Sequence, residues 1–385
     1  MNQIIKALAP ELTAWRRDFH AHPELSFHEH RTSDIVAAKL ESWGIEVTRN
    51  IAGTGLVGTL RAGGGNRAIA IRADMDALPI QEASQTDYVS QNPGVMHACG
   101  HDGHTTMLLG AAKYLSESRS FSGIVHFIFQ PAEENGGGAE VMIREGLFER
   151  FPADSVFGAH NDPSLPLGEI SISDGTVNAA ADTLTINLTG KGGHAARPQC
   201  CVDPVVAGCQ IVLALQSMVA RRTDPQDSAV LSITQFHAGS ADNIIPQTAM
   251  LNGTVRTLLP RMQNWMEATI PGLIMSVAEA YGVTAEVIYE RGYPPVINDA
   301  AASARAALAA GRVASQVHRD LPPSMGAEDF SYMASAVPGC FVRIGQRQGD
   351  KGGVGLHHPL YDFNDEALPI GASLWAALVE QELPL

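Results

Sequence analysis

The sequence has few basic residues, few cysteines and no long apolar runs. Its 26 lysines and arginines are outnumbered by 41 aspartates and glutamates, so the formal net charge is -15 at pH 7. Nucleic acids and anionic membranes bind to basic faces, which argues against both as partners. The five cysteines are odd in number, and Cys200 and Cys201 are adjacent, so a disulfide framework is not expected.

The N-terminal segment also lacks the apolar core of a signal peptide, and no apolar run approaches the length of a membrane span. We therefore expect a cytoplasmic protein whose thiols are reduced. What the chain does have is length. Its 385 residues exceed the usual size of one hydrophobic core, so two domains are expected.

Short apolar runs alternate with helical patterns in the first part of the chain. The apolar runs are 55–60, 68–73, 124–129 and 155–160, and the helical patterns are 3–20, 29–43 and 105–115. Buried strands that alternate with helices predict an α/β fold, in which a mostly parallel sheet is covered by helices on both faces.

From about residue 181 the predicted order becomes strand, helix, strand, strand, helix, strand, which is the order of a ferredoxin-like α+β unit. We expect this segment, 181–291, to be an inserted domain. The flanking segments, 1–180 and 292–385, would then form one discontinuous domain. Pro271 lies within the second predicted helix of the insert and could kink it.

The segment HACGHDGH, residues 97–104, concentrates side chains that could carry chemistry. Cys99 and His101 are two positions apart, just before a predicted helix, so both could converge on one ion. Imidazole and thiolate together suit zinc or another first-row divalent metal. Taken alone, Cys99 could instead be a buried small hydrophobic residue or a nucleophile.

Three other motifs place polar residues where apolar strands end. Glu133 and Glu134 follow 124–129, His160 ends 155–160, and Asp74 and Asp76 follow 68–73. Open α/β sheets bind ligands at the carboxyl ends of their strands. One of two adjacent carboxylates could bind a metal while the other takes a proton from water. Each motif alone could be structural, but their recurrence favours a shared site for metal-assisted hydrolysis.

Together these segments resemble the aminoacylase/carboxypeptidase superfamily of di-metal amidohydrolases, in the branch of hippurate, N-acyl-amino-acid and indole-acetyl-amino-acid hydrolases. The resemblance covers nearly the whole chain in order. The motifs that carry it are RRDFHAHPELSFHEHRT (16–32), RADMDALPI (72–80), HACGHDGHT (97–105), QPAEENGGGA (130–139), GKGGHAARP (190–198), NIIPQTAMLNGTVR (243–256), MGAEDFSYM (325–333) and LHHPLYDFNDEAL (356–368).

The resemblance implies two divalent metal ions per subunit, which could be Mn²⁺, Zn²⁺, Co²⁺ or Ni²⁺. Cys99 would bridge the two ions as a thiolate. His101 and His160 would complete the protein ligands of one ion, and Glu134 and His357 those of the other.

The same resemblance assigns supporting roles to neighbouring residues. Glu133 would be the general base and acid. Asp76 aligns with an aspartate that orients a ligand histidine, while Asp74 stands where the peptidase branches have a ligand histidine and could be purely structural. His357 is preferred over His358 as a ligand because of the family's His-X-Pro pattern. His97 and His104 would not be ligands but would support the ligands or stand at the start of the helix.

The inserted domain would act as a lid or dimerisation domain and would supply further site residues. His194 resembles a histidine that stabilises the oxyanion, although it could be an ordinary loop residue. Asn243 and Arg256 match positions that could hold the substrate carboxylate, since arginine binds carboxylates bidentately, although Arg256 could equally form a structural ion pair. Cys200 and Cys201, which stand where relatives more often have another histidine or a small polar residue, leave the substrate preference open.

The implied function is a metal-dependent amidohydrolase that cleaves the amide bond of an N-acyl amino acid with an activated water and Glu133 as base. The alternatives are a dipeptidase or exopeptidase of the same superfamily, a hydrolase with Cys99 as nucleophile, and a non-catalytic binding relative. The expected partner is a small-molecule substrate. A homodimer or dimer-based oligomer is also expected, because ferredoxin-like inserts often have exposed edges that can pair.

Overall fold

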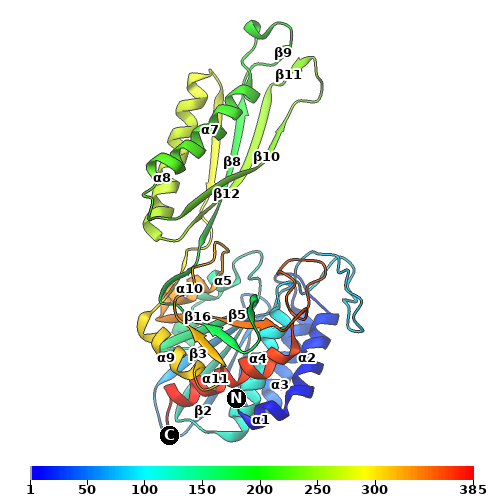
Figure 1. Cartoon of the computed structure of the whole chain (residues 1–385), viewed down its shortest axis with the longest axis vertical. Helices are drawn as coiled ribbons and strands as arrows, with labels where there is room; N and C mark the ends of the chain where they lie inside the picture. The colour runs from blue at the N-terminus through cyan, green and yellow to red at the C-terminus, as the bar shows by residue number, and fades with distance from the viewer. Residues whose placement is uncertain (1) are drawn as a thin grey trace. The chain divides into compact units, whose positions relative to one another are not determined.

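A computed structural model describes residues 2–385 of the chain (Figure 1). The chain divides into two compact units. Unit 1 comprises Met1–Gly175, Ile297–Pro322 and Asp329–Leu385, and unit 2 comprises Thr176–Val296 and Pro323–Glu328. The segment predicted to be an inserted domain lies within unit 2.

Unit 1 is built on an eight-stranded sheet in the order β1-β2-β4-β3-β5-β16-β6-β15. Neighbours from β4 through β3 and β5 to β16 are parallel, whereas β1 and β2 form an antiparallel edge. The predicted α/β class with a mostly parallel sheet is confirmed. The strands are β1 Glu46–Ile51, β2 Gly55–Ala62, β3 Ala68–Asp74, β4 Gly123–Gln130, β5 Ser155–Pro166, β6 Glu169–Ser171, β15 Gln316–His318 and β16 Gly339–Arg347.

Helices cover both faces of this sheet. On β2, a Cβ at Gly58 would meet Leu40 of α3, and one at Gly55 would meet Met142 of α5. Gly55 and Gly58 are three positions apart, and positions an odd number of residues apart on a strand face opposite sides, so α3 and α5 lie on opposite faces of the sheet. The helices are α1 Gln3–Ala7, α2 Ala9–Ala21, α3 His30–Ser42, α4 His101–Ser118, α5 Gly138–Arg144, α6 Leu147–Arg150, α9 Ala300–Ala310, α10 Phe330–Ala336 and α11 Leu368–Glu382, with the 3-10 helix η2 Asp365–Ala367.

Two details differ from the sequence-based expectations. The predicted helix over 3–20 divides at Leu8, because Pro10 in the first turn of α2 has no N–H to donate to the carbonyl four residues earlier, which interrupts the helical hydrogen bonds. His160 lies within β5 and not at its end. β5 pairs with β3 only as far as Gly158, but its pairing with β16 extends to Pro166.

Unit 2 contains a four-stranded antiparallel sheet in the order β10-β12-β8-β13, with α7 and α8 on one face (Figure 1). The predicted order of strands and helices is the one observed. Its elements are β7 Gly175–Asn178, β8 Ala180–Thr189, β9 Gly193–His194, η1 Pro198–Cys200, α7 Pro204–Arg222, β10 Ala229–Ala238, β11 Ile244–Ile245, β12 Thr248–Thr257, α8 Pro260–Ala280, β13 Thr284–Glu290 and β14 Val296–Asn298. α8 continues through Pro271.

By length and composition α7 is apolar enough to cross a membrane, so the prediction that no apolar run approaches that length was too strong. In the structure, however, Ala207, Ile211 and Leu215 of α7 pack into the hydrophobic core of unit 2. The apolar face of a helix in a water-soluble domain packs in the same way.

Candidate metal centre

The five side chains predicted to bind metal lie together in unit 1, in two groups that share Cys99. One group is Cys99, His101 and His160, and the other is Cys99, Glu134 and His357. Within each group, the potential ligand atoms all lie within 4.8 Å of one another. These groups are the two ligand sets that the resemblance implies. Cys99 belongs to both groups, as a thiolate that bridges two ions must.

The turn before α4 aims Cys99 and His101 at the same point. Gly100 between them has a φ of 101°, and a Cβ there would lie 2.3 Å from Oδ1 of Asn161 and 2.6 Å from the Tyr361 hydroxyl. Only glycine fits both this backbone conformation and this space.

His357 reaches the same point from a loop near the end of the chain. Its backbone N–H donates to the Ala98 carbonyl at 2.7 Å, and its φ is 63°, in the left-handed region that non-glycine residues rarely adopt. Such strain is concentrated at functional sites. His358 makes a local contact instead, because its Nδ1 accepts a hydrogen bond from the backbone N–H of Leu360.

Buried atoms in these groups have unused lone pairs. Among the residues that the structure describes, Nε2 of His101 is buried without a hydrogen bond, and it lies 3.9 Å from Oε1 of Glu134, which in turn lies 3.2 Å from Nε2 of His357. Nε2 of His160 lies 3.2 Å from Sγ of Cys99. Buried polar atoms without partners cost free energy, and a cation among these nitrogen, oxygen and sulfur atoms would satisfy them. The donor set therefore fits divalent metal ions.

Hydrogen bonds turn the ligand histidines toward this point. Nδ1 of His101 lies 3.1 Å from Oδ1 of Asp76, and Nδ1 of His160 lies 2.8 Å from the carbonyl oxygen of Asn161. Since an oxygen acceptor requires a proton on each Nδ1, both Nε2 atoms keep their lone pairs for a metal. The other oxygen of Asp76 accepts from the backbone N–H of Glu134 at 3.0 Å, so one aspartate supports both ligand groups.

The surroundings of Cys99 do not favour an activated cysteine nucleophile. Burial and the carboxylates of Glu134 and Glu133 raise the pKa of the Cys99 thiol well above its ordinary value. Activated cysteine nucleophiles need the opposite shift. Burial alone would raise the pKa of Glu134, but hydrogen bonding to His357 holds it below its ordinary value. Burial and His104 keep the pKa of His160 well below its ordinary value, so its imidazole is neutral.

A network of hydrogen bonds surrounds the ligands; the sequence indicated supporting roles for Asp74 and His104 but not for Asn161, which contacts His104. His104 on α4 is held between Oδ1 of Asp74 at 2.6 Å and Oδ1 of Asn161 at 2.7 Å. Although Asp74, His101 and His104 could form a third metal group, both ring nitrogens of His104 have these partners. Asp74 in turn accepts from Arg72 at 2.7 Å. Only the adjacency of Asn161 to His160 could have signalled its role.

Glu133 belongs to unit 1, whereas the three remaining predicted site residues belong to unit 2, where the structure brings two of them together. His194 on β9 pairs with Ile244 of β11, and the backbone N–H of Ala195 donates to the carbonyl of Asn243 at 3.0 Å. Nδ1 of His194 accepts from the backbone N–H of Ala196 at 3.2 Å, so the exposed Nε2 of a neutral ring carries the proton. Arg256 lies on a different strand, β12, where it donates to the Val255 carbonyl at 3.2 Å.

The remaining sequence feature of unit 2 is the cysteine pair after His194. All five cysteines are free, as expected for a chain without a disulfide framework. Cys200 is exposed. Cys201 is so close to Gly193 that a Cβ added to this glycine would lie 2.6 Å from the Cys201 Sγ. Cys201 therefore packs against the short strand that carries His194.

Comparisons with known proteins agree with the geometry of the site. Residues 70–381 match the sequence profile of Peptidase family M20/M25/M40. Hippurate hydrolase of Campylobacter jejuni is 40% identical over 382 residues, which cover 98% of both chains. N-acetylcysteine deacetylase of Bacillus subtilis is 38% identical over 376 residues, which cover 97% of both chains.

A solved structure shares both the fold and much of the sequence. The Bacillus subtilis YXEP protein, described as a dinuclear metal-binding peptidase from the M20 family, matches with a TM-score of 0.85 and 35% identity. The match covers 98% of this chain and 99% of that chain. The predicted resemblance is confirmed, and the chain belongs to peptidase family M20/M25/M40.

Proposed function

We propose that this chain is a metal-dependent amidohydrolase that cleaves an N-acyl amino acid to a carboxylate and a free amino acid. The observation that carries the proposal is the pair of ligand groups that share Cys99, with Glu133 beside them. The names of the relatives add support, since hippurate and N-acetylcysteine are both acylated amino acids.

Two divalent ions, which could be Mn²⁺, Zn²⁺, Co²⁺ or Ni²⁺, would be held by the two groups, with Cys99 in both. When bound, such ions acidify water and polarise an amide carbonyl. The aspartate Asp76 would keep His101 oriented toward its ion. The buried thiol of Cys99 would lose its proton on binding and contribute negative charge between the two positive centres.

Glu133 would carry the proton during the reaction. It follows β4, is 7% exposed, and has a carboxylate oxygen within 4.8 Å of ligand atoms of His101 and Glu134. From there it can take a proton from the attacking water and deliver it to the leaving amine, as a general base and then a general acid.

Unit 2 would serve as the lid and contribute three residues to the same reaction. His194 would donate its Nε2 proton to the developing oxyanion. Asn243, which is next to it, and Arg256 would bind the carboxylate of the amino-acid portion of the substrate.

Replacement of Glu133 tests this proposal. We expect Glu133→Gln to lower kcat for hippurate by about 10²-fold or more, because the variant cannot accept a proton. Metal analysis should show unchanged metal content, since the ligands are intact. Glu140→Gln on α5, an exposed carboxylate, is the matched control and should retain full activity.

Turnover of Glu133→Gln within a few-fold of wild type would contradict the mechanism. N-acetyl amino acids and dipeptides, assayed beside hippurate, separate the proposed activity from an exopeptidase. Faster cleavage of dipeptides than of any N-acyl amino acid would favour the exopeptidase.

We also propose that the protein is a cytoplasmic homodimer, or an oligomer built from dimers, paired through unit 2. β10 is an edge strand of the four-stranded sheet, and its Val230 and Phe236 are 39% and 37% exposed. Exposed edges of this kind can pair with a second copy. Sedimentation equilibrium should then give at least twice the chain mass of 40.9 kDa.

A further inference from the structure

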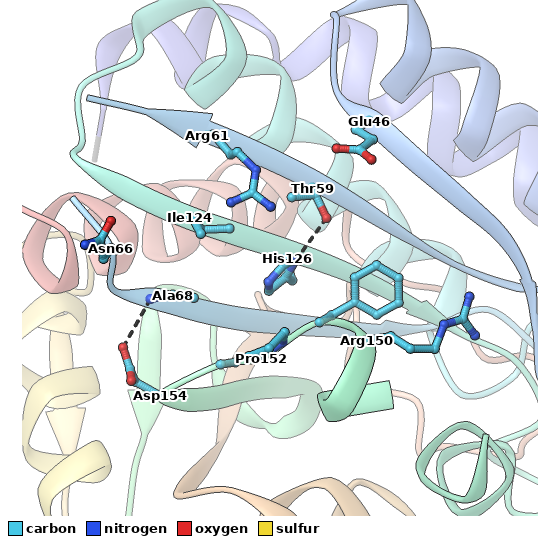
Figure 2. Close-up of a pocket in the computed structure, with 12 residues that line it drawn as sticks. Glu46, Thr59, Arg61, Asn66, Ala68, Ile124, His126, Arg150, Pro152 and Asp154 are labelled. Carbon is cyan, nitrogen blue, oxygen red and sulfur yellow. Dashed lines mark hydrogen bonds between the residues drawn. The ribbon is translucent and has the colours of Figure 1, made fainter. Parts of the chain in front are cut away.

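A hollow in unit 1 lies at the end of the sheet opposite to the metal ligands. It has a volume of about 440 Å³ and is lined by residues of β1, β2, β3, β4 and α6 (Figure 2). Ala68, which begins β3, and Ile124, near the start of β4, lie in its wall. The candidate metal ligands follow the other ends of these strands. Binding sites for small molecules commonly have volumes of this order.

The sheet register places the key side chains on one face. Glu46 on β1 is opposite Thr59 on β2, which is opposite His126 on β4. Arg61 follows two positions after Thr59 and is opposite Ile124. Because residues two apart on a strand face the same side, all five project toward the hollow.

Two opposite charges at the hollow, both on exposed side chains, have no partner in the described part of the protein. Within residues 2–385, the side chains of Glu46 and Arg61 form no hydrogen bond or ion pair, whereas Arg49 on the same strand as Glu46 pairs with Asp34 at 2.7 Å. Diagonal neighbours on an antiparallel pair are about 7–8 Å apart. This spacing leaves room between the carboxylate and the guanidinium for a small ligand that carries both charges.

The floor between these two charges is neutral. His126 is 3% exposed, and its Nδ1 lies 3.0 Å from Oγ1 of Thr59, as the dashed line in Figure 2 shows. Burial lowers the pKa of His126 to about 4 even though it hydrogen-bonds the backbone of Pro152, and the charge of Arg61 lowers it further. The imidazole is therefore uncharged near neutral pH and does not compete for an anion.

Two further charged residues line the hollow; Asp154 is paired within the protein, whereas Arg150 contacts only an aromatic ring and points elsewhere. Asp154 accepts from the backbone N–H of Ala68 at 3.1 Å and lies 3.7 Å from Arg67. The guanidinium of Arg150 lies 5.5 Å from the centre of the Phe151 ring, and in Figure 2 it extends away from Arg61. On the face of the sheet that lines the hollow, Arg61 and Glu46 are thus the two charges that the described residues leave without a partner, and they lie beside apolar surface from Ile124 and Phe151.

We propose that this hollow binds a free α-amino acid with an apolar side chain. Arg61 would bind the carboxylate, Glu46 the ammonium group, and Ile124 and Phe151 the side chain. A simple anion or cation would leave one of the two protein charges unmatched. The proposal concerns binding at a site remote from the metal ligands and does not depend on the proposed reaction, although the amino acid released by that reaction belongs to the same class.

Calorimetric titration of the purified full-length protein with L-leucine tests the proposal. We expect Arg61→Gln to weaken leucine binding by about 10-fold or more, because a charge-assisted hydrogen bond to the carboxylate is lost. Glu46→Gln should weaken it by about 5-fold or more. L-Leucinamide, without the carboxylate, and 4-methylpentanoate, without the ammonium group, should bind at least about 10-fold more weakly than leucine.

Two controls keep the outcome specific. Arg221→Gln, which removes an exposed arginine from α7, should bind leucine as wild type does. Hippurate turnover by Arg61→Gln should equal that of wild type, which separates failure at this hollow from failure of the proposed activity. The proposal is overturned if leucine does not bind, if Arg61→Gln and Glu46→Gln bind it unchanged, or if 4-methylpentanoate binds as tightly.

Discussion

His20 on α2 is the centre of a buried polar network beside the first turn of α4. Its Nδ1 lies 2.9 Å from Asp102 and its Nε2 lies 3.3 Å from Glu82. Arg16, one turn earlier on α2, lies 3.6 Å from the same Asp102 and 2.7 Å from Asp365. Buried charges are tolerated only when they are paired in this way. The network therefore ties α2 to the helix that begins at His101.

We predict a pH-dependent contribution of His20 to stability. Burial alone would lower the pKa of His20, but hydrogen bonds from its ring to Asp102 and Glu82 raise it from 6.5 to about 9. The stabilisation is therefore fully present below pH 6.5 and is lost as the pH rises through 9. A shift of this size corresponds to about 3 kcal/mol.

Urea unfolding between pH 6 and 10 measures this contribution. The free energy of unfolding of wild type should fall across that range by more than that of His20→Gln, which lacks the titrating group. His30→Gln, at an exposed histidine in the first turn of α3, should keep the wild-type slope. Equal slopes for wild type and His20→Gln would rule out the assigned role.

At the scale of elements, the start of α4 decides whether the ligand groups form. The turn at Gly100 sets the directions of Cys99 and His101, and the N–H of His357 is tied to Ala98 just before it. A short loop, a helix start and a distant loop are thus coupled through a few backbone contacts. A shift of about 1 Å in any of them would spoil the ligand geometry.

Gly100→Ala is therefore expected to destabilise the protein more than a glycine replacement that introduces only backbone strain. Both Gly100 and Gly94 have positive φ, but a Cβ at Gly94 has open space, whereas one at Gly100 would clash with Asn161 and Tyr361. Gly94→Ala should cost about 1 kcal/mol from backbone strain. Gly100→Ala should lower the free energy of unfolding by at least about 2 kcal/mol more than Gly94→Ala does, and it should also lower metal affinity.

Thermal unfolding and metal titration of the two variants compare these effects. Gly94→Ala should keep wild-type metal affinity, because it does not move the ligand turn. If Gly100→Ala were as stable as Gly94→Ala and bound metal normally, the turn would not be essential to the site.

At the scale of the whole molecule, the ligands are gathered from segments that are far apart in the sequence. Cys99 and His357 are 258 positions apart, yet both belong to one group. β16, near the end of the chain, lies between β5 and β6 in the sheet. A metal bound by such ligands holds together parts of unit 1 that are remote in the unfolded chain, so metal binding should stabilise the native state.

Chelation should therefore lower both activity and the melting temperature. At a metal concentration of 100 times Kd, binding to the native state alone contributes about 2.7 kcal/mol per site. Readdition of Mn²⁺, Zn²⁺ or Co²⁺ should restore both properties. Cys99→Ser should lose most of this response, and Cys209→Ser, which replaces an exposed cysteine, should keep it. Activity that survives exhaustive chelation but not alkylation would favour a cysteine nucleophile.

The sequence allowed the candidate ligands to be predicted, but not all of the residues that support them. Glu133 and Glu134 could be selected because they follow a recognisable apolar run, and His160 because it ends another, although β5 continues beyond it; the family resemblance placed Cys99 and His357 beside them. The supporting residue Asn161 could not be selected in this way. An asparagine in a polar segment has no local signature that reveals which distant side chain it will contact.

By itself, the sequence determined the alternation of strands and helices, the order of elements in the insert, and the motifs that identify the family. These properties depend on local periodicity and on short spacings. Only the tertiary structure decided the contact of His104 with Asp74 and Asn161, the antiparallel edge formed by β1 and β2, and the unmatched charges of Glu46 and Arg61 in one hollow. The reason is physical: such contacts arise when packing brings together residues that no local pattern connects.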